Sequence, residues 1–379
     1  MRGFPGHRVV GAVLLLGALC VGWTAAHEFH RMRVEEPLYP GPGVSGVRAL
    51  SDYAPWLRGS GLDTEVYVLD SGRPGGTVLI IGGTHPNEPA GFMAAVVVLE
   101  CAQVGQGRLL VVPRANKSGF SCTDPGEGMP TRFTVETNHG IRWFRLGSRF
   151  TNWVHQWPDP LVYVHFASGQ RLSGAETRNL NRAFPGRRDG SPTERVAHAL
   201  VQLVRAEGVD LVVDLHESAP EYPVNNAIIA HERAAELAAI AMMRLQEDGL
   251  TFNLEPSPYC FHGLTHREIG DHTQALALLL ETANPMQGRL RGAGVPQLVV
   301  NGLDRCYLRA GTIRNKTVLR VPYDAKGLPL AERVGRHTAA LLALFNAFSE
   351  LYPDRPVEVS GLPDYQALCK HSLGAYLRG

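Results

Sequence analysis

The chain has 379 residues, of which 44% are apolar and 19% are charged, as in an ordinary folded protein rather than a disordered one. This length allows one large α/β domain with insertions, or two modest domains. Lysine and arginine together number 37 against 36 acidic residues, so no strong net charge attracts a polyanion. We therefore expect no nucleic-acid partner.

Residues 1–26 have the pattern of an export signal. Arg2, His7 and Arg8 precede an uncharged stretch, 9–23, which is followed by Thr24-Ala25-Ala26. This order gives a basic region, an apolar region and a small-residue cleavage site. The stretch is shorter than the about 20 residues of a full membrane span, but an uncleaved anchor stays an alternative. We expect an exported protein, periplasmic or extracellular, that meets a membrane only if this segment is retained.

From residue 65 onward, predicted strands and helices alternate. Continuous apolar runs such as Thr77-Val78-Leu79-Ile80-Ile81 indicate strands buried on both faces. The predicted strands are 65–69, 77–81, 108–113, 209–215 and 276–280, and the predicted helices are 90–100, 193–207, 231–248 and 329–351. This rhythm predicts an α/β fold with a mixed, largely parallel central sheet flanked by helices.

The same pattern predicts how the chain divides into parts. Residues 27–60 are predicted to form an irregular lead-in, and 61–352 the main domain. Residues 117–163, rich in aromatic, glycine and charged residues, break the rhythm and are predicted to be an insertion over one end of the sheet. Residues 286–326 are predicted as turns and short strands, and 353–379 as a polar C-terminal tail.

A first polar cluster follows the predicted strand 77–81. His85 and Glu88 are three residues apart in a Gly-rich turn, close enough for an imidazole and a carboxylate to meet at one metal ion. In α/β sheets, ligands bind beyond the carboxyl ends of the strands. Such a pair alone is only weak evidence for a metal site, because the same two residues are also compatible with a Gly-rich turn whose polar side chains face solvent.

A second cluster, Asp214-Leu215-His216, ends the predicted strand 209–215. His216 can complete a set of two histidines and one carboxylate, which is a ligand set of catalytic zinc. Asp214 is placed in sequence to accept a hydrogen bond from the other ring nitrogen of a ligand histidine. The alternative is a buried Asp–His pair that only holds the strand end.

A third motif carries a family resemblance. His85-x-x-Glu88, then Asn181-Arg182-x-Phe184-Pro185-Gly186, then Asp214-Leu215-His216 resemble the succinylglutamate desuccinylase and aspartoacylase branch of the zinc carboxypeptidase superfamily. In order and character the resemblance spans about 78–285. It implies a zinc carboxypeptidase-like fold.

The resemblance also implies roles. His85, Glu88 and His216 would hold one Zn²⁺ ion per chain. Asn181 and Arg182 would bind a substrate carboxylate, a task that suits the fork of a guanidinium. The alternative is that the two residues only cap a turn.

The catalytic groups follow in the same way. Glu281, at the end of the predicted strand 276–280, would take a proton from water and give it to the leaving nitrogen. An arginine would polarise the scissile carbonyl, and Arg171 is the first candidate and Arg178 the second.

Two other features stay open. Trp143, Phe144, Phe150, Trp153 and Trp157 of the insertion could form a lid or a partner surface, or a small satellite core. The histidines of 262–272 (His262, His266 and His272) are interpreted as loop residues near the cleft, with a second metal site as the alternative.

The sequence thus predicts a zinc-dependent hydrolase that cleaves an amide bond in a small molecule or short peptide bearing a free carboxylate. N-acyl amino acids fit the motifs best, and the alternative is an exported metallocarboxypeptidase that acts on peptides, including cell-wall peptides. Two rivals outside catalysis are a binding module that keeps the metal without turnover and a secreted protein that sequesters zinc. The oligomeric state stays open.

Overall fold

The computed structural model describes residues 5–313 and 318–379, and over these residues eight strands form one central sheet. In their order across the sheet the strands are β1 (Gly46–Ala49), β2 (Glu65–Asp70), β5 (Arg108–Val112), β3 (Thr77–Ile81), β10 (Leu211–Ser218), β13 (Leu276–Ala283), β11 (Ala227–Ala230) and β12 (Asn253–Pro256). The central strands β5, β3, β10 and β13 run parallel. Strand β2 pairs antiparallel with β1 and β5, and β11 pairs antiparallel with β13 but parallel with β12. The predicted mixed, largely parallel sheet is confirmed.

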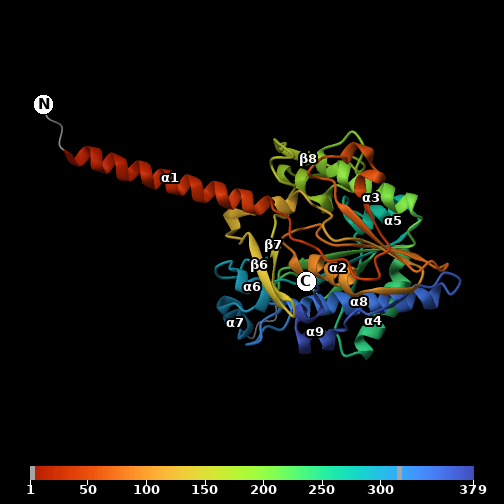
Figure 1. Cartoon of the computed structure of the whole chain (residues 1–379). Coiled ribbons are helices and arrows are strands. Elements are labelled where there is room, and N and C mark those ends of the chain that lie inside the picture. Colours follow the sequence, from red (N-terminus) through yellow and green to blue (C-terminus); the bar gives the residue numbers. More distant parts are fainter. Residues whose placement is uncertain (1–4, 314–317) are drawn as a thin grey trace.

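Helices cover both faces of this sheet (Figure 1). The described residues form the helices α1 (Pro5–Arg33), α2 (Pro89–Cys101), α3 (Pro192–Ala206), α4 (Ala235–Glu247), α5 (Thr265–His272), α6 (Pro296–Asn301), α7 (Arg305–Gly311), α8 (Leu330–Leu351) and α9 (Tyr365–His371). Helices α2, α4 and α8 share one buried core with the sheet, and α3 and α5 share the other. Helix α1 extends away from the body of the protein.

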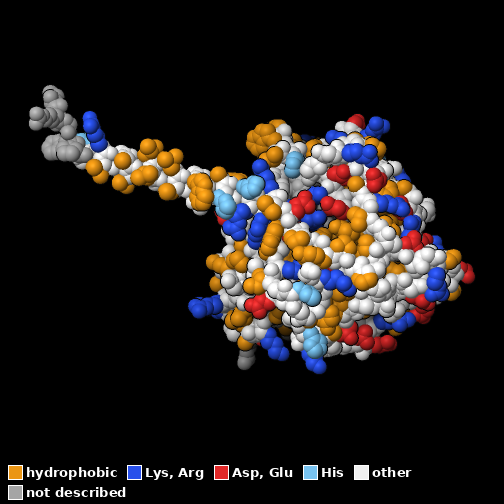
Figure 2. All heavy atoms as spheres, in the orientation of Figure 1, with side chains coloured by type: hydrophobic (Ala, Val, Ile, Leu, Met, Phe, Trp, Pro, Cys, Tyr) orange, Lys and Arg blue, Asp and Glu red, His pale blue; other side chains and the backbone are white. Residues whose placement is uncertain are grey.

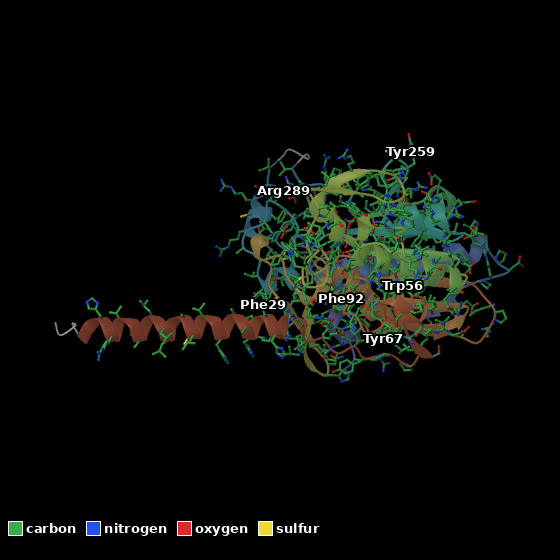
Figure 3. The ribbon with its side chains drawn as sticks, turned by 90° about the horizontal axis from the view of Figure 1, so that it is seen from above. Phe29, Trp56, Tyr67, Phe92, Tyr259 and Arg289 are labelled. Atoms are coloured by element: carbon green, nitrogen blue, oxygen red, sulfur yellow. The ribbon has the colours of Figure 1, made fainter. Side chains whose placement is uncertain are left out.

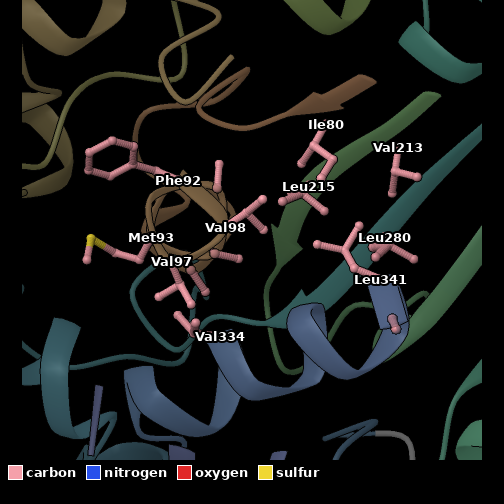
Figure 4. Close-up of a cluster of buried hydrophobic side chains, with 14 of the residues drawn as sticks. Ile80, Phe92, Met93, Val97, Val98, Val213, Leu215, Leu280, Val334 and Leu341 are labelled. Carbon is pink, nitrogen blue, oxygen red and sulfur yellow. The ribbon is translucent and has the colours of Figure 1, made fainter. Parts of the chain in front are cut away.

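The alternation of side chains along each central strand explains the two cores. In β3, Ile80 points to the core of α2 and α8, and Leu79 points to the core of α3. Figure 4 shows Ile80, Val213 and Leu280 facing α2 and α8. Because both faces are covered, the strands need apolar residues at every position. Each fully buried aliphatic side chain stabilises the folded state by about 1.5–3 kcal/mol relative to the same side chain left exposed.

Three segments differ from their predicted form. Residues 27–60 include the C-terminal part of α1 and also β1, so they add a strand to the sheet edge. Residues 286–326 contain α6 and α7 rather than short strands. Residues 353–379 are not a free tail: they form β14 (Glu358–Ser360) and α9, and Leu368 is buried in the main core. Short helices of one or two turns leave too little periodicity to be predicted.

The insertion at 117–163 is built onto the body rather than packed as a separate unit. Its hairpin, β6 (Arg132–Thr137) and β7 (Gly140–Arg145), places Phe133 and Phe144 in the main core. Phe144 therefore belongs to the main core, and not to a lid, a partner surface or a satellite core. Two further small pairs are β4 (Gln103–Gln106) with β14, and β8 (Val162–Val164) with β9 (Arg171–Ser173).

Candidate functional site

The candidate site lies where three parallel strands end. The loop that carries His85 and Glu88 follows β3, His216 lies near the end of β10, and Glu281 lies near the end of β13. His216 and Glu281 are Cα partners in the pairing of β10 with β13. Parallel strands place their carboxyl ends at the same edge, so these side chains meet there.

Backbone geometry fixes the loop between β3 and α2. Gly83 has a φ of +65°, a conformation that side chains disfavour. The N–H of Glu88 donates to the carbonyl of His85 at 3.0 Å and closes a turn, and Pro89 then begins α2. A Cβ on Gly91 would lie 2.2 Å from the carbonyl oxygen of Leu215. Glycine is therefore required for α2 to start this close to β10.

The side chains of His85, Glu88 and His216 converge. His85 Nδ1 lies 2.7 Å from Glu88 Oε1, and His216 Nδ1 lies 2.8 Å from Glu88 Oε2. The two Nδ1 atoms are 3.2 Å apart. All three residues are buried, and they form a group that could hold a metal ion, with the ligand atoms within 4.8 Å of one another.

The outer nitrogens of both rings are held by oxygen atoms. His216 Nε2 is 2.8 Å from Asp214 Oδ2, the contact expected from the sequence, and Asp214 Oδ1 accepts a hydrogen bond from Thr84 Oγ1 at 2.8 Å. His85 Nε2 is 2.8 Å from Asn179 Oδ1. Such partners fix the ring orientation and leave each Nδ1 free to bind a metal. Asn179 was not predicted, although it lies two residues before Asn181 in the same motif.

Charges in this group are strongly coupled. Burial, together with the nearby charge of Arg149, lowers the pKa of His85 to about 4. Burial opposes charge on Glu88 too, but His85 and His216 hold its pKa well below the usual range. Despite burial, Asp214 and Glu88 hold the pKa of His216 well above its usual value. The group thus keeps a carboxylate ionised in a buried place, as a cation site requires.

His85 and Glu88 line a cavity of about 680 Å³. Asn181 and Arg182 line it, as do Glu281 and several apolar side chains. The Oδ1 atom of Asn181 already accepts hydrogen bonds from the N–H and hydroxyl of Thr265, which leaves its amide N–H groups as the available donors. Arg182 stacks over the ring of Phe261, and burial lowers its pKa to about 10. Figure 3 shows Arg289, another lining residue, at the same edge of the molecule as Tyr259.

Glu281 also faces this cavity. Among the described residues its Oε2 is buried and has no hydrogen-bond partner. Burial, followed by the proximity of Glu88, raises its pKa to about 8. The carboxyl group is therefore available to a molecule in the cavity rather than used to hold the fold.

The structure places neither predicted arginine at the cavity. Arg171 lies exposed on β9. Arg178 is buried but directed to Asp159, with Nε–Oδ1 at 2.7 Å and its guanidinium 3.5 Å from the centroid of Trp153. Arg149 of the insertion lines the cavity instead, with its NH1 atom 3.3 Å from Glu88 Oε1. Sequence spacing could not identify Arg149, because no recognisable motif surrounds it.

The histidines of 262–272 separate into two groups. His262 and His272 both lie next to Glu268, at 2.9 and 3.2 Å. His266, on α5, lines the cavity, and neither of its ring nitrogens has a hydrogen-bond partner among the described residues. These residues form no second metal group within the described part of the chain. His266 is instead a polar residue that faces the cavity, which the sequence only placed near it.

Comparison with known proteins bears on these residues directly. Residues 163–287 match the model of the succinylglutamate desuccinylase/aspartoacylase catalytic domain. The predicted resemblance is confirmed. The matched segment contains Asn181, Arg182, His216 and Glu281, whereas His85 and Glu88 lie before it. This part of the chain is therefore similar to the catalytic domain of a family of hydrolases. No curated protein sequence matches the chain.

Solved structures show partial similarity. A succinylglutamate desuccinylase/aspartoacylase from Rhodobacter sphaeroides is 18% identical, with a TM-score of 0.34, over 58% of this chain and 51% of that one. A metallo-carboxypeptidase from Burkholderia cenocepacia is 14% identical, with a TM-score of 0.45, over 82% and 66%. The apo cell shape determinant protein Csd4 from Helicobacter pylori is 14% identical, with a TM-score of 0.44, over 81% and 59%. The alignments therefore span about half to two thirds of those chains.

Proposed function

We propose that the protein is a zinc-dependent hydrolase that cleaves an amide bond in a small substrate with a free carboxylate, as in N-acyl amino acid deacylation. One observation carries the proposal: His85 and Glu88 of the His85–Glu88–His216 group line the same cavity as Glu281, whose Oε2 has no partner among the described residues, and as Arg149 and Arg182. A binding module would not need a free buried carboxyl at this point.

The donor set fits zinc. Two imidazole nitrogens and one carboxylate are a ligand set of catalytic zinc sites, at about 2.0–2.2 Å from the ion. The separations of 2.7, 2.8 and 3.2 Å between the ligand atoms are below twice that distance. Zinc bound here would polarise the scissile carbonyl and make water more acidic. We infer one ion per chain, held by His85, Glu88 and His216.

The remaining roles belong to the chain's own residues. Asn181 and Arg182 would bind the substrate carboxylate through their N–H groups. Glu281 would accept a proton from the attacking water and pass it to the leaving nitrogen. Arg149 would donate to the oxygen of the scissile carbonyl as negative charge develops on it. His266 would donate or accept a hydrogen bond with a polar group of the substrate.

A second candidate is an exported metallocarboxypeptidase. Helix α1 is apolar and exposed, as an export signal or anchor requires, and a cavity of about 680 Å³ has room for a short peptide. Both candidates use the same chemistry, because the C-terminal residue of a peptide and an N-acyl amino acid each present a carboxylate next to an amide.

The test is metal analysis of the purified protein followed by hydrolysis assays. N-acetyl and N-succinyl amino acids and tripeptides with free C-termini are offered before and after chelation, and again after zinc is restored. We expect zinc-dependent release of one amino acid, which the Glu281→Gln variant loses while keeping its zinc. Full activity in the metal-free protein would overturn the proposal. Tight zinc binding without turnover of any substrate would favour a binding module, and several ions per chain would favour sequestration.

A further inference from the structure

Helix α1 leaves the body of the protein as a single exposed rod (Figure 1). By length and composition it could cross a membrane, and none of its apolar stretch is buried in the protein. Its uncharged part, 9–26, is about 27 Å long at 1.5 Å per residue, close to the about 30 Å of a bilayer's hydrocarbon core. Figure 3 shows Phe29 near the point where α1 joins the body.

A second apolar feature lies in the insertion. Trp153, Val154 and Trp157 are exposed, with 46%, 67% and 73% of their surface accessible, and Leu161 follows them fully exposed. The rings of Trp153 and Trp157 are 5.1 Å apart. We call these four residues the aromatic surface. None of them lines the cavity of the candidate site or joins a core.

The aromatic surface is held in place from beneath. The guanidinium of Arg178 lies 3.5 Å from the centroid of the Trp153 ring. Arg178 is fixed in turn by Asp159, at 2.7 and 3.1 Å, and by the carbonyl of Thr151 at 2.9 Å. Because these contacts already hold the segment in place, its two exposed tryptophans would lose little conformational entropy on contact with another surface. They differ in this from side chains at a mobile loop tip.

The aromatic surface lies beside the base of α1. One groove is lined by Arg33, the last residue of α1, together with Val154 and His155 of the insertion. Figure 2 shows an apolar cluster on the body close to the end of α1. Arg31 and Arg33 are exposed at the same place. Apolar, aromatic and basic side chains thus gather where the helix leaves the body.

We propose that the aromatic surface rests in the interfacial region of the bilayer that α1 crosses. Tryptophan prefers this region, since its ring is apolar and its N–H polar, and arginine at the end of a span reaches the lipid headgroups. A bilayer is favoured over a second copy or a soluble partner because the adjacent helix also needs an apolar phase along its length. The body is then held against the membrane at two points, α1 and the aromatic surface.

The full chain, reconstituted in vesicles of phosphatidylcholine and phosphatidylglycerol in equal parts, provides the test. Lipids brominated near the carboxyl end of the acyl chain quench the fluorescence of tryptophans that reach the interface. The chain has five tryptophans. Trp23 on α1 reports insertion of the helix, and Trp56, half-buried beside Arg188, is the matched control. The variants are Trp153→Phe/Trp157→Phe and Trp56→Phe.

We expect the number of lipid-quenched tryptophans to fall from three to one in the double variant and to stay unchanged in Trp56→Phe. Quenching of Trp23 alone in the parent protein would overturn the proposal. If Trp153 and Trp157 were shielded from an aqueous quencher but not quenched by brominated lipid, another protein surface would cover them, and the proposal would also fall. Absence of all lipid quenching would show that α1 does not insert, with the same consequence. None of these readings depends on enzymatic activity.

Discussion

His216 on β10 and Glu281 on β13 are directly paired residues of two neighbouring parallel strands. One belongs to the group that could hold a metal, and the other presents a buried carboxyl oxygen without a partner among the described residues. Under the proposed function, two adjacent strand ends therefore supply a metal ligand and a proton acceptor at the same level of the sheet. Their separation is set by the strand pairing and not by a flexible loop.

The first prediction concerns Glu281. Glu281→Gln keeps the size of the side chain but removes the proton acceptor, so we expect turnover to fall by about 10²–10⁴-fold. Zinc content, measured by elemental analysis, should stay unchanged, because Glu281 is not one of the ligands. Glu358→Gln, on the outlying strand β14, is the control and should retain full activity. Unchanged turnover in Glu281→Gln would contradict the assigned role.

The second prediction concerns Asp214. Its carboxylate contacts Nε2 of His216 at 2.8 Å. Asp214→Asn therefore weakens the contact that orients the imidazole ring of His216 and lowers the basicity of that ring. We expect the dissociation constant for zinc to rise by about 10–100-fold, as measured by competition with a chromophoric chelator. Asp271→Asn, which changes a carboxylate paired with Arg267, should leave zinc affinity unaltered. Equal affinities in the two variants would count against the role of Asp214.

The third prediction distinguishes the arginines. Arg149 lines the cavity, so we expect Arg149→Ala to lower kcat by about 10²–10³-fold, the effect of removing one donor to a developing oxyanion. Arg171→Ala, on an exposed position of β9, should have no effect on kcat. A loss of activity in Arg171→Ala but not in Arg149→Ala would restore the original assignment from the sequence.

Arg178→Ala is predicted to act on stability. Arg178 forms a largely buried pair with Asp159 and supports Trp153. Removing one partner of such a pair costs about 3 kcal/mol or more, since the other charge stays behind. Denaturant unfolding should therefore show a lower free energy of unfolding, with kcat near that of the parent protein while the chain is folded.

The last prediction concerns pH. Burial lowers the pKa of His337, on α8, to about 3, whereas in the unfolded chain it is about 6.5. The unfolded state then binds more protons below pH 6.5, so the stability contributed above that pH is lost as the pH falls toward 3. The slope from this group is up to about 1.4 kcal/mol per pH unit.

The check is urea unfolding of chelated protein at pH 7 and pH 5. His337→Gln should lower stability at both values but reduce the difference between them. His139→Gln, on the exposed turn between β6 and β7, is the control and should leave the difference unchanged. An equal difference in parent and His337→Gln would contradict the prediction.

The parts of the site that depend on strand ends are predictable from the sequence. His85, Glu88, His216 and Glu281 each follow or end a continuous apolar run, and the topology of a parallel sheet then brings them to one edge. The same periodicity predicted α2, α3 and α8 to within one or two residues at most ends. Asp214 could be predicted as a partner of His216 because the two are two residues apart on one strand, so their side chains point to the same face.

The rest depends on contacts between distant segments. Arg149 reaches the cavity through the path of an insertion, which no local pattern records. Asn179 supports His85 across 94 positions of the chain. His266 stands out only through its burial and its unpartnered nitrogens. The aromatic residues of the insertion divide between the core and the surface, and hydrophobicity alone could not tell Phe144 from Trp157.

The two parts of the site differ in how freely they can change. The metal-ligand group and Glu281 are tied to strands that are packed on both faces, so substitutions around them disturb the core. Arg149 comes from an insertion at the surface, where loops tolerate changes in length and sequence. Under the proposed function, changes in residues 117–163 can therefore alter substrate preference without disturbing the strands that carry His216 and Glu281.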